Sequence, residues 1–347
     1  MNDTVSMQKT FLPGSCLAAL LGLLCILCFA LPSSAQTSHT KWVDEISFDT
    51  RASFHQQLYN GDYTTHFQGE YLNLHIKGKL SPQLSYRVRQ RFTKHVDAQN
   101  PFNATDFLWI DWRPNTNWSF VFGKQPILMG GYEFDSAPID VYYYSAFANA
   151  LYQYYAFGVS AHRMWDDGQQ DLAIQFIPSP VSSGLQDAYS LNRYWNGRLQ
   201  PWWRTLWSTN LVEDQYHRIL NYITFSNKFV FNKFFIDVDL MNRASFEQKQ
   251  FFFSDWSLII KGILTLGKWN LCTKFGMEQN DAANVSADGL SYDLALPAGS
   301  RFLYGGVGVE YFPLGNENLR LHIACFRDNF ININNLDMGI TWRFRLL

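Results

Sequence analysis

Apolar and polar side chains alternate along several segments of this chain. In the segment 269–277 the odd positions hold Trp, Leu, Thr, Phe and Met, and the even positions hold Asn, Cys, Lys and Gly. The same period of two recurs in 234–243 and in 338–345, where Asp or Arg stands between apolar neighbours. Successive side chains of a β-strand point to opposite faces, so this period predicts strands with one apolar and one polar face.

The polar faces carry full charges, which separates two kinds of all-β protein. A soluble sandwich buries its apolar faces, whereas a transmembrane barrel turns them toward lipid and can enclose water. Short turns alternate with longer connections along this chain, as they do in outer-membrane barrels. We read the short turns at 78–83, 114–117, 166–169, 196–200, 231–233, 264–268 and 313–318. The pattern predicts an all-β fold, a transmembrane antiparallel β-barrel of about 16 strands. Counts of 14 or 18 stay open, because the alternation is blurred between residues 187 and 208.

The first 35 residues have the features of a secretory leader. Lys9 precedes an apolar run from Cys16 to Leu31, and small residues follow up to Ala35. This order is typical of a signal peptide with its cleavage site. We therefore predict a signal peptide at 1–35 and an outer-membrane β-barrel at 36–347, with a retained membrane anchor as the alternative for the leader. No later segment has the roughly 18 uninterrupted apolar residues of a spanning helix.

The composition is rich in aromatic residues, which a membrane barrel explains. Aromatic residues make up 17% of the chain and charged residues only 17%. Trp and Tyr gather at both surfaces of a bilayer, and other rings face lipid. A soluble aromatic core is the alternative, but it leaves the charges on the opposing strand faces unexplained. The net charge of −2 does not indicate the concentrated basic surface that nucleic-acid binding requires.

The segment 85–92, SYRVRQRF, places three arginines at every second position. In a strand Arg87, Arg89 and Arg91 share one face, which would line the lumen of a barrel. Guanidinium groups suit oxyanions such as phosphate and carboxylate. Mixed lumen charges that only solvate the wall are the alternative. The predicted pore-lining and solute-binding residues are Arg87, Arg89, Arg91, Lys94, Arg113 and Lys124.

A long connection from Gln125 to Leu151 is too apolar and ring-rich for a solvent-exposed tip. We expect it to fold inward and to narrow the pore, and Gly130 and Gly131 would permit a sharp entry of the backbone. An external lid on neighbouring loops is the alternative. In the inward arrangement the acids of this loop would lie opposite the basic wall. These predicted constriction residues are Glu133, Asp135 and Asp140.

Catalytic signatures are missing from the sequence. The chain has no Gly-x-Ser-x-Gly elbow, no His-Glu-x-x-His pair and no glycine-rich phosphate loop. Its 8 histidines show no short metal-ligand spacing, so we expect no metal, no cofactor and no enzyme activity. A site assembled from separate strands stays open. Only Cys272 and Cys325 follow the leader, and two isolated cysteines indicate packing rather than a disulfide framework.

Three segments, 123–145, 221–245 and 69–92, resemble Bacteroidetes-type members of the phosphate-selective porin family. The resemblance implies a sixteen-stranded barrel, a homotrimer, passive passage of small solutes and an inward third external loop. It also implies that Arg87, Arg89 and Arg91 form a lumen ladder. The chain departs from the family in lacking a dense lysine cluster and in ending on Leu347 rather than on an aromatic residue.

These features together favour a porin in the outer membrane of a Gram-negative cell. It would pass small hydrophilic solutes by diffusion, with an anion preference, for phosphate or other oxyanions, as the finer hypothesis. Its partners would be these solutes or anions, membrane lipid and two further copies of the chain. A barrel that acts as an adhesin or as a structural part of a surface complex is the alternative, and an outer-membrane enzyme is a third.

Overall fold

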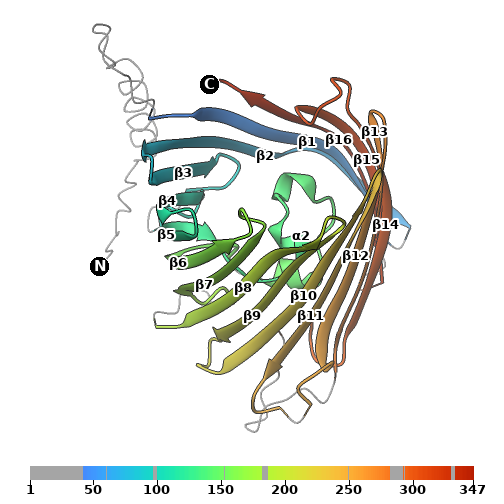
Figure 1. Ribbon diagram of the computed structural model, residues 1–347. Helices are drawn as coiled ribbons and strands as arrows, with labels where there is room; N and C mark the ends of the chain where they lie inside the picture. The colour runs from blue at the N-terminus through green and yellow to red at the C-terminus, as the bar shows by residue number, and fades with distance from the viewer. Residues whose placement is uncertain are drawn as a thin grey trace, which may run out of the picture. The chain divides into compact units, whose positions relative to one another are not determined.

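The computed structural model describes most of the chain after the leader (Figure 1). The described residues are 42–59, 61–96, 100–151, 153–181, 187–248, 250–281, 292, 294–329 and 333–347. The predicted signal peptide, 1–35, lies outside them. Within the described part of the chain, no helix combines the length and the apolar character needed for a membrane span.

The described residues form 16 antiparallel strands in one closed barrel, which confirms the predicted fold. Each strand pairs with its neighbour in the chain, and the first strand pairs with the last. The strands are β1 (Glu45–Tyr59), β2 (Asp62–Ser81), β3 (Leu84–Arg91), β4 (Thr105–Asn115), β5 (Trp118–Pro126), β6 (Tyr155–Trp165), β7 (Gln170–Pro178), β8 (Tyr189–Gln200), β9 (Trp203–Glu213), β10 (Ile219–Phe231), β11 (Phe234–Ser245), β12 (Asp255–Leu266), β13 (Trp269–Asn280), β14 (Arg301–Tyr311), β15 (Leu319–Asp328) and β16 (Ile333–Arg345).

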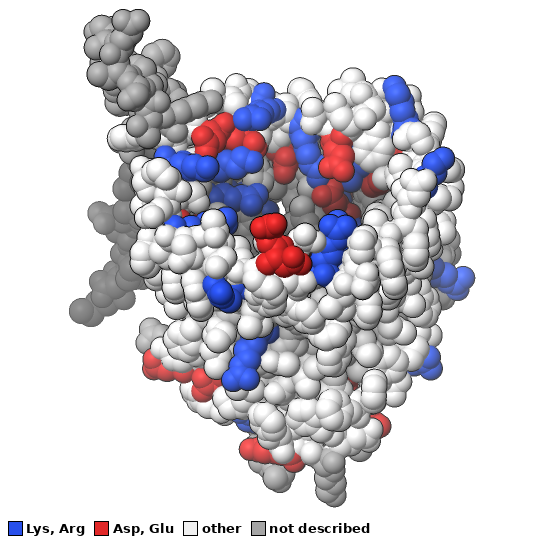
Figure 2. Space-filling view, viewed as in Figure 1, with Lys and Arg blue, Asp and Glu red and all other residues white. Residues whose placement is uncertain are grey.

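The two faces of the wall are inverted relative to a soluble protein. In β15 the side chains of Arg320 and His322 are 5% and 3% exposed, whereas Leu321 and Ile323 are 42% and 54% exposed. Charged groups therefore point into the barrel and aliphatic groups point away from it. Figure 2 shows Lys, Arg, Asp and Glu side chains gathered around a hollow on the viewed face. This inversion is the one that a lipid-embedded barrel requires.

Short turns join the strands at one end of the barrel, close to the predicted positions. One predicted turn, Asn196–Gln200, is wrong, because β8 continues to Gln200 and the chain reverses at Pro201 and Trp202. Proline lacks the amide proton that a ladder needs, so a turn accommodates Pro201 without loss of a strand hydrogen bond.

The longest described connection, residues 127–154, joins β5 to β6 and lies within the ring of strands (Figure 1). It contains α2 (Tyr132–Asp135), the 3-10 helix η1 (Pro138–Asp140) and α3 (Ala146–Ala150). Its apolar side chains pack on inward-facing residues of the wall, and this interface forms the main core of the protein. The core includes Ile127, Met129, Phe147, Leu151, Val212, Tyr222 and Met241.

The apolar outer face predicts how a charged substitution on it changes the free energy of unfolding. Ile323 lies near the middle of β15 on the outward face. We expect Ile323→Arg to lower the free energy of unfolding in lipid vesicles by about 2–4 kcal/mol, because an outward charge near the bilayer midplane is poorly solvated. The matched control Ile323→Leu should change it little. An unchanged or raised stability of Ile323→Arg, measured by urea unfolding, would contradict a lipid-facing β15.

Candidate pore and its constriction

The arginine stripe faces the barrel interior, but much of its charge is already paired. Asp106 accepts hydrogen bonds from Arg89 Nε and from Arg91, both at 3.0 Å. Arg89 is only 6% exposed, and its guanidinium lies over the rings of Phe107 and Tyr155. Two of the three predicted arginines thus share one carboxylate, which limits their role as free anion sites.

Asp106 was missed by the sequence analysis because it breaks the alternation. In the register of β3 with β4, Arg89 lies opposite Phe107 and Gln90 lies opposite Thr105. Asp106 is the extra residue between them, at a β-bulge that turns its side chain toward the two arginines. Bulges commonly re-aim a side chain in this way.

The other predicted cations of this wall differ in environment. Arg87 lies 4.7 Å from the centre of the Phe107 ring and forms no ion pair with any described residue. Arg113 pairs with Asp111 at 2.7 Å, and its side chain is 57% exposed. Lys94 follows β3 and lines a cavity of about 500 Å³ together with Arg91. Arg87 therefore offers the least compensated charge of the stripe.

The prediction that Lys124 lines the lumen is wrong. Lys124 lies opposite Leu108 and Phe157 in the register of β5 with its neighbours, and Phe157 is an outward-facing, exposed ring. Its Nζ lies 6.0 Å from the centre of that ring and donates to the carbonyl oxygen of Phe102 at 2.6 Å. The alternation along β5 puts Lys124 on the same side as Phe122, which is also exposed.

The acids of the long connection bind cations that the sequence analysis did not select. Glu133 pairs with Lys274 at 3.0 Å, and Asp140 pairs with Arg320 and Arg343 at 2.8 and 2.6 Å. Asp135, the last residue of α2, is exposed. The expected opposition of these acids to the arginine stripe is wrong for Glu133 and Asp140, since their partners belong to β13, β15 and β16.

Two carboxylates of the wall bind the backbone of this connection. Asp239 of β11 accepts from the amides of Tyr132 and Glu133 at 2.9 and 3.0 Å, at the start of α2. Gly131 makes this approach possible, because a Cβ there would lie 2.3 Å from Asp239 Cγ.

The second carboxylate, Glu278 of β13, binds the backbone at the start of α3. It accepts from the amides of Ala146 and Phe147 at 2.6 and 3.0 Å. The first amides of a helix have no partner within the helix, so an external carboxylate satisfies them. The wall thereby holds both short helices at their N-terminal ends.

Other parts of the connection are bound by β1 and β14. Arg51 of β1 is buried and donates to the carbonyl oxygens of Ile139 and Val141, each at 3.0 Å. The hydroxyl of Tyr142 donates to Glu310 at 2.7 Å. Burial raises the pKa of the Tyr142 phenol, so it stays a protonated donor. The connection is therefore bound to the wall at several points, on β1, β11, β13 and β14.

Open space remains beside this connection, next to β1 and β2. A cavity of about 290 Å³ is lined by Tyr142, Tyr144 and Asp337 among others. It shares Arg51, His55, Gln57 and Glu70 with the 500 Å³ cavity near Lys94. The path along this side of the barrel is thus bordered by groups of both charges.

Residues 46–188 match the family model described as phosphate-selective porin O and P. No curated protein matches the chain. Several solved structures share its fold at low sequence identity. The outer membrane channel DcaP of Acinetobacter baumannii has a TM-score of 0.61 at 10% identity, covering 90% of this chain and 100% of that chain. The anion-selective porin from Comamonas acidovorans has a TM-score of 0.60 at 8% identity, covering 86% and 98%.

A third similar structure is the outer-membrane expressed OmpT of Vibrio cholerae, with a TM-score of 0.59 at 10% identity and coverage of 90% and 100%. At these identities the likeness establishes the fold, and together with the family match it points to a channel rather than an enzyme. With its closed barrel, its inverted faces and the match over residues 46–188, this chain is similar to the phosphate-selective porin O and P family.

Proposed function

We propose that this porin passes small hydrophilic solutes across the outer membrane by diffusion, with a preference for anions. The observation that carries the proposal is the charged inner face of a closed sixteen-stranded barrel. A barrel of this size leaves room for an aqueous channel, whereas a smaller one fills with its own side chains. The charges solvate that channel, and the apolar outer face stabilises the wall in membrane lipid.

The proposed anion preference rests on the side of the lumen near β3. Asp106 pairs with Arg89 and Arg91, and Arg87 is the arginine of the stripe without an ion-pair partner among the described residues. A net positive wall raises the local concentration of anions. The similar porin from Comamonas acidovorans is described as anion-selective, which supports the same preference here.

The connection 127–154 acts in this proposal as the constriction of the pore. Its support is the binding of its backbone to Asp239, Glu278 and Arg51, which belong to three different strands. A loop held at several points keeps a fixed cross-section, and the charges on it and around it then govern passage. A lid that leaves the channel width unchanged is the competing interpretation.

We further propose that residues 1–35 are a signal peptide removed on export and that 36–347 assemble as a homotrimer. The features of the leader support the first part. The family resemblance supports the second, and a similar structure, OmpT of Vibrio cholerae, is described in a trimer form.

The constriction is tested by releasing the loop from the wall. The double variant Asp239→Ala with Glu278→Ala leaves four backbone amides without their acceptors, which costs about 1–3 kcal/mol for each unsatisfied group. We expect the single-channel conductance in planar bilayers to rise, and deletion of Tyr132 to Tyr142 to raise it further. The control Asp237→Ala alters a neighbouring acid that pairs with Lys228. Unchanged conductance in both loop variants would favour the lid.

The selectivity is tested with a matched pair of cations. Arg87→Gln removes a positive charge from the lumen, and Lys124→Gln removes one from the outward face. We expect only Arg87→Gln to shift the reversal potential in a KCl gradient toward cation preference, because charge in the lumen sets the local ion concentration. Equal shifts in both variants, or none in either, would remove Arg87 from the mechanism.

A further inference from the structure

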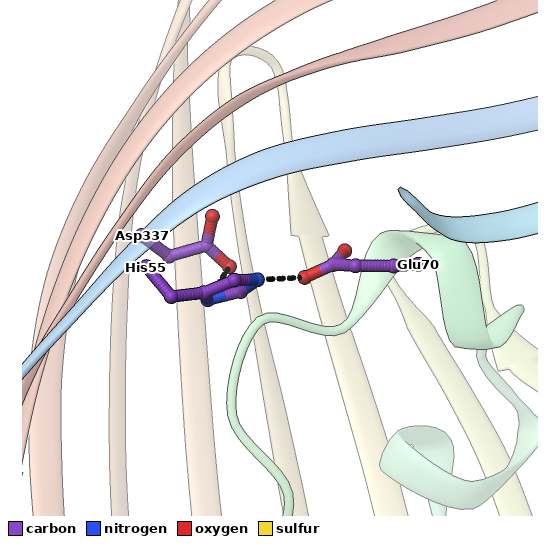
Figure 3. A group of neighbouring side chains, drawn as sticks. All are labelled: His55, Glu70 and Asp337. Atoms are coloured by element: carbon purple, nitrogen blue, oxygen red, sulfur yellow. Dashed lines mark ion pairs between the residues drawn. The ribbon is translucent and has the colours of Figure 1, made fainter. Parts of the chain in front are cut away.

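A cluster of one imidazole and two carboxylates lies where the barrel closes. His55 of β1 is opposite Asp337 of β16 in the strand register. Glu70 comes from β2, the neighbour of β1 on the other side. Figure 3 shows the His55 ring between the two carboxylates.

Glu70 joins this cluster because of a β-bulge. Arg51 lies opposite Tyr71 and Ala52 lies opposite Gly69, so Glu70 is the extra residue of β2. The bulge interrupts the regular alternation of β2 and turns the Glu70 carboxylate toward the interior.

The possible ligand atoms of the cluster lie close to one another. His55 Nε2 lies 2.6 Å from Glu70 Oε1, whereas His55 Nδ1 lies 3.8 Å from Asp337 Oδ2. The longer distance exceeds a hydrogen bond, so the ring does not bridge both carboxylates as a doubly donating imidazolium would. One ligand atom from each residue lies within 4.8 Å of the others. One ion binds a single ring nitrogen, and zinc bonds of about 2.0–2.2 Å place tetrahedral ligand atoms roughly 3.3 Å apart, so small side-chain shifts bring the three ligand atoms onto one ion.

The second oxygen of each carboxylate contacts a residue outside the cluster. Asp337 Oδ1 lies 2.9 Å from Nε2 of His322, whose side chain is fully buried. Glu70 Oε2 pairs with Nε of Arg51. Partners of this kind orient metal ligands and leave their remaining oxygen for the ion. Each carboxylate therefore presents one oxygen toward His55.

Access and charge both suit a cation. His55 and Glu70 line the 500 Å³ cavity, which has room for an ion with its remaining water ligands. The ring of His66 stacks on that of His55, with 5.2 Å between the ring centres. With neutral His55, two carboxylates and the Arg51 guanidinium carry a net charge of −1, which a divalent cation more than compensates. A nitrogen donor beside two carboxylates suits Zn²⁺ better than Ca²⁺ or Mg²⁺, which prefer all-oxygen sites.

We propose that His55, Glu70 and Asp337 form a binding site for one divalent transition-metal ion of the Zn²⁺ class on the lumen wall. No covalent or redox step is involved. The proposal does not rest on the proposed passage of solutes, and its test is a direct binding measurement that does not depend on conductance.

The experiment is calorimetric titration of ZnCl₂ into untagged, EDTA-treated barrel in detergent. Cys272→Ser and Cys325→Ser form the background, because both thiols are free. We expect one Zn²⁺ per chain. His55→Ala and Asp337→Asn should each weaken binding by at least about tenfold, since even loss of a residue that only orients a ligand costs about 10–100-fold.

The matched control is His75→Ala. His75 is an inward-facing residue of β2 that pairs with a single carboxylate, Asp49, at 3.0 Å. Its removal should leave Zn²⁺ binding unchanged, and circular dichroism should show an intact barrel in every variant. The proposal is overturned if the parent protein binds no Zn²⁺, if His55→Ala retains full affinity, or if His75→Ala weakens binding as much as His55→Ala does.

Discussion

The pairing of β1 with β16 is the interaction on which the rest of the structure depends. In hydrocarbon an unpaired backbone amide or carbonyl finds no water, so an open sheet edge cannot lie in a membrane. The register from Ser47 opposite Arg345 to Tyr59 opposite Ile333 removes both edges of the sheet. Once the sheet is closed, one face of every strand meets lipid and the other meets an enclosed interior, which explains why Ile323 is exposed and His322 is buried.

Enclosure has an electrostatic consequence. Charged groups inside the barrel are crowded by the loop and by one another, so they are mostly paired rather than free. Asp106 serves two arginines, and Asp140 of the loop binds Arg320 and Arg343. Selectivity in such a lumen depends on the few charges that remain uncompensated, and the number of arginines in a strand is a poor measure of it.

The fold could be predicted from the sequence, but most of the site could not. Particular residues show the reasons. A period of two is local, so the faces of β11, β13 and β16 could be predicted. Counting the same period along β5 would also have placed Lys124 outside. Asp106 and Glu70 stand at bulges, where the alternation fails and no local pattern indicates the direction of the side chain. Asp140 and its partner Arg320 are 180 residues apart, and only the closed barrel brings them together.

The closing strands also connect features that are far apart in the chain. Arg51 donates through one nitrogen to the loop carbonyls of Ile139 and Val141 and pairs through another with Glu70. One guanidinium thus joins the backbone of the connection 127–154, the proposed constriction, to the carboxylate beside His55. Since Arg51 is buried and its donors are committed in both directions, a shift of Glu70 toward a bound ion must be accommodated either by the guanidinium or by the loop. The same seam that closes the barrel therefore links the carboxylate of the proposed metal site to the backbone of the proposed constriction through one side chain.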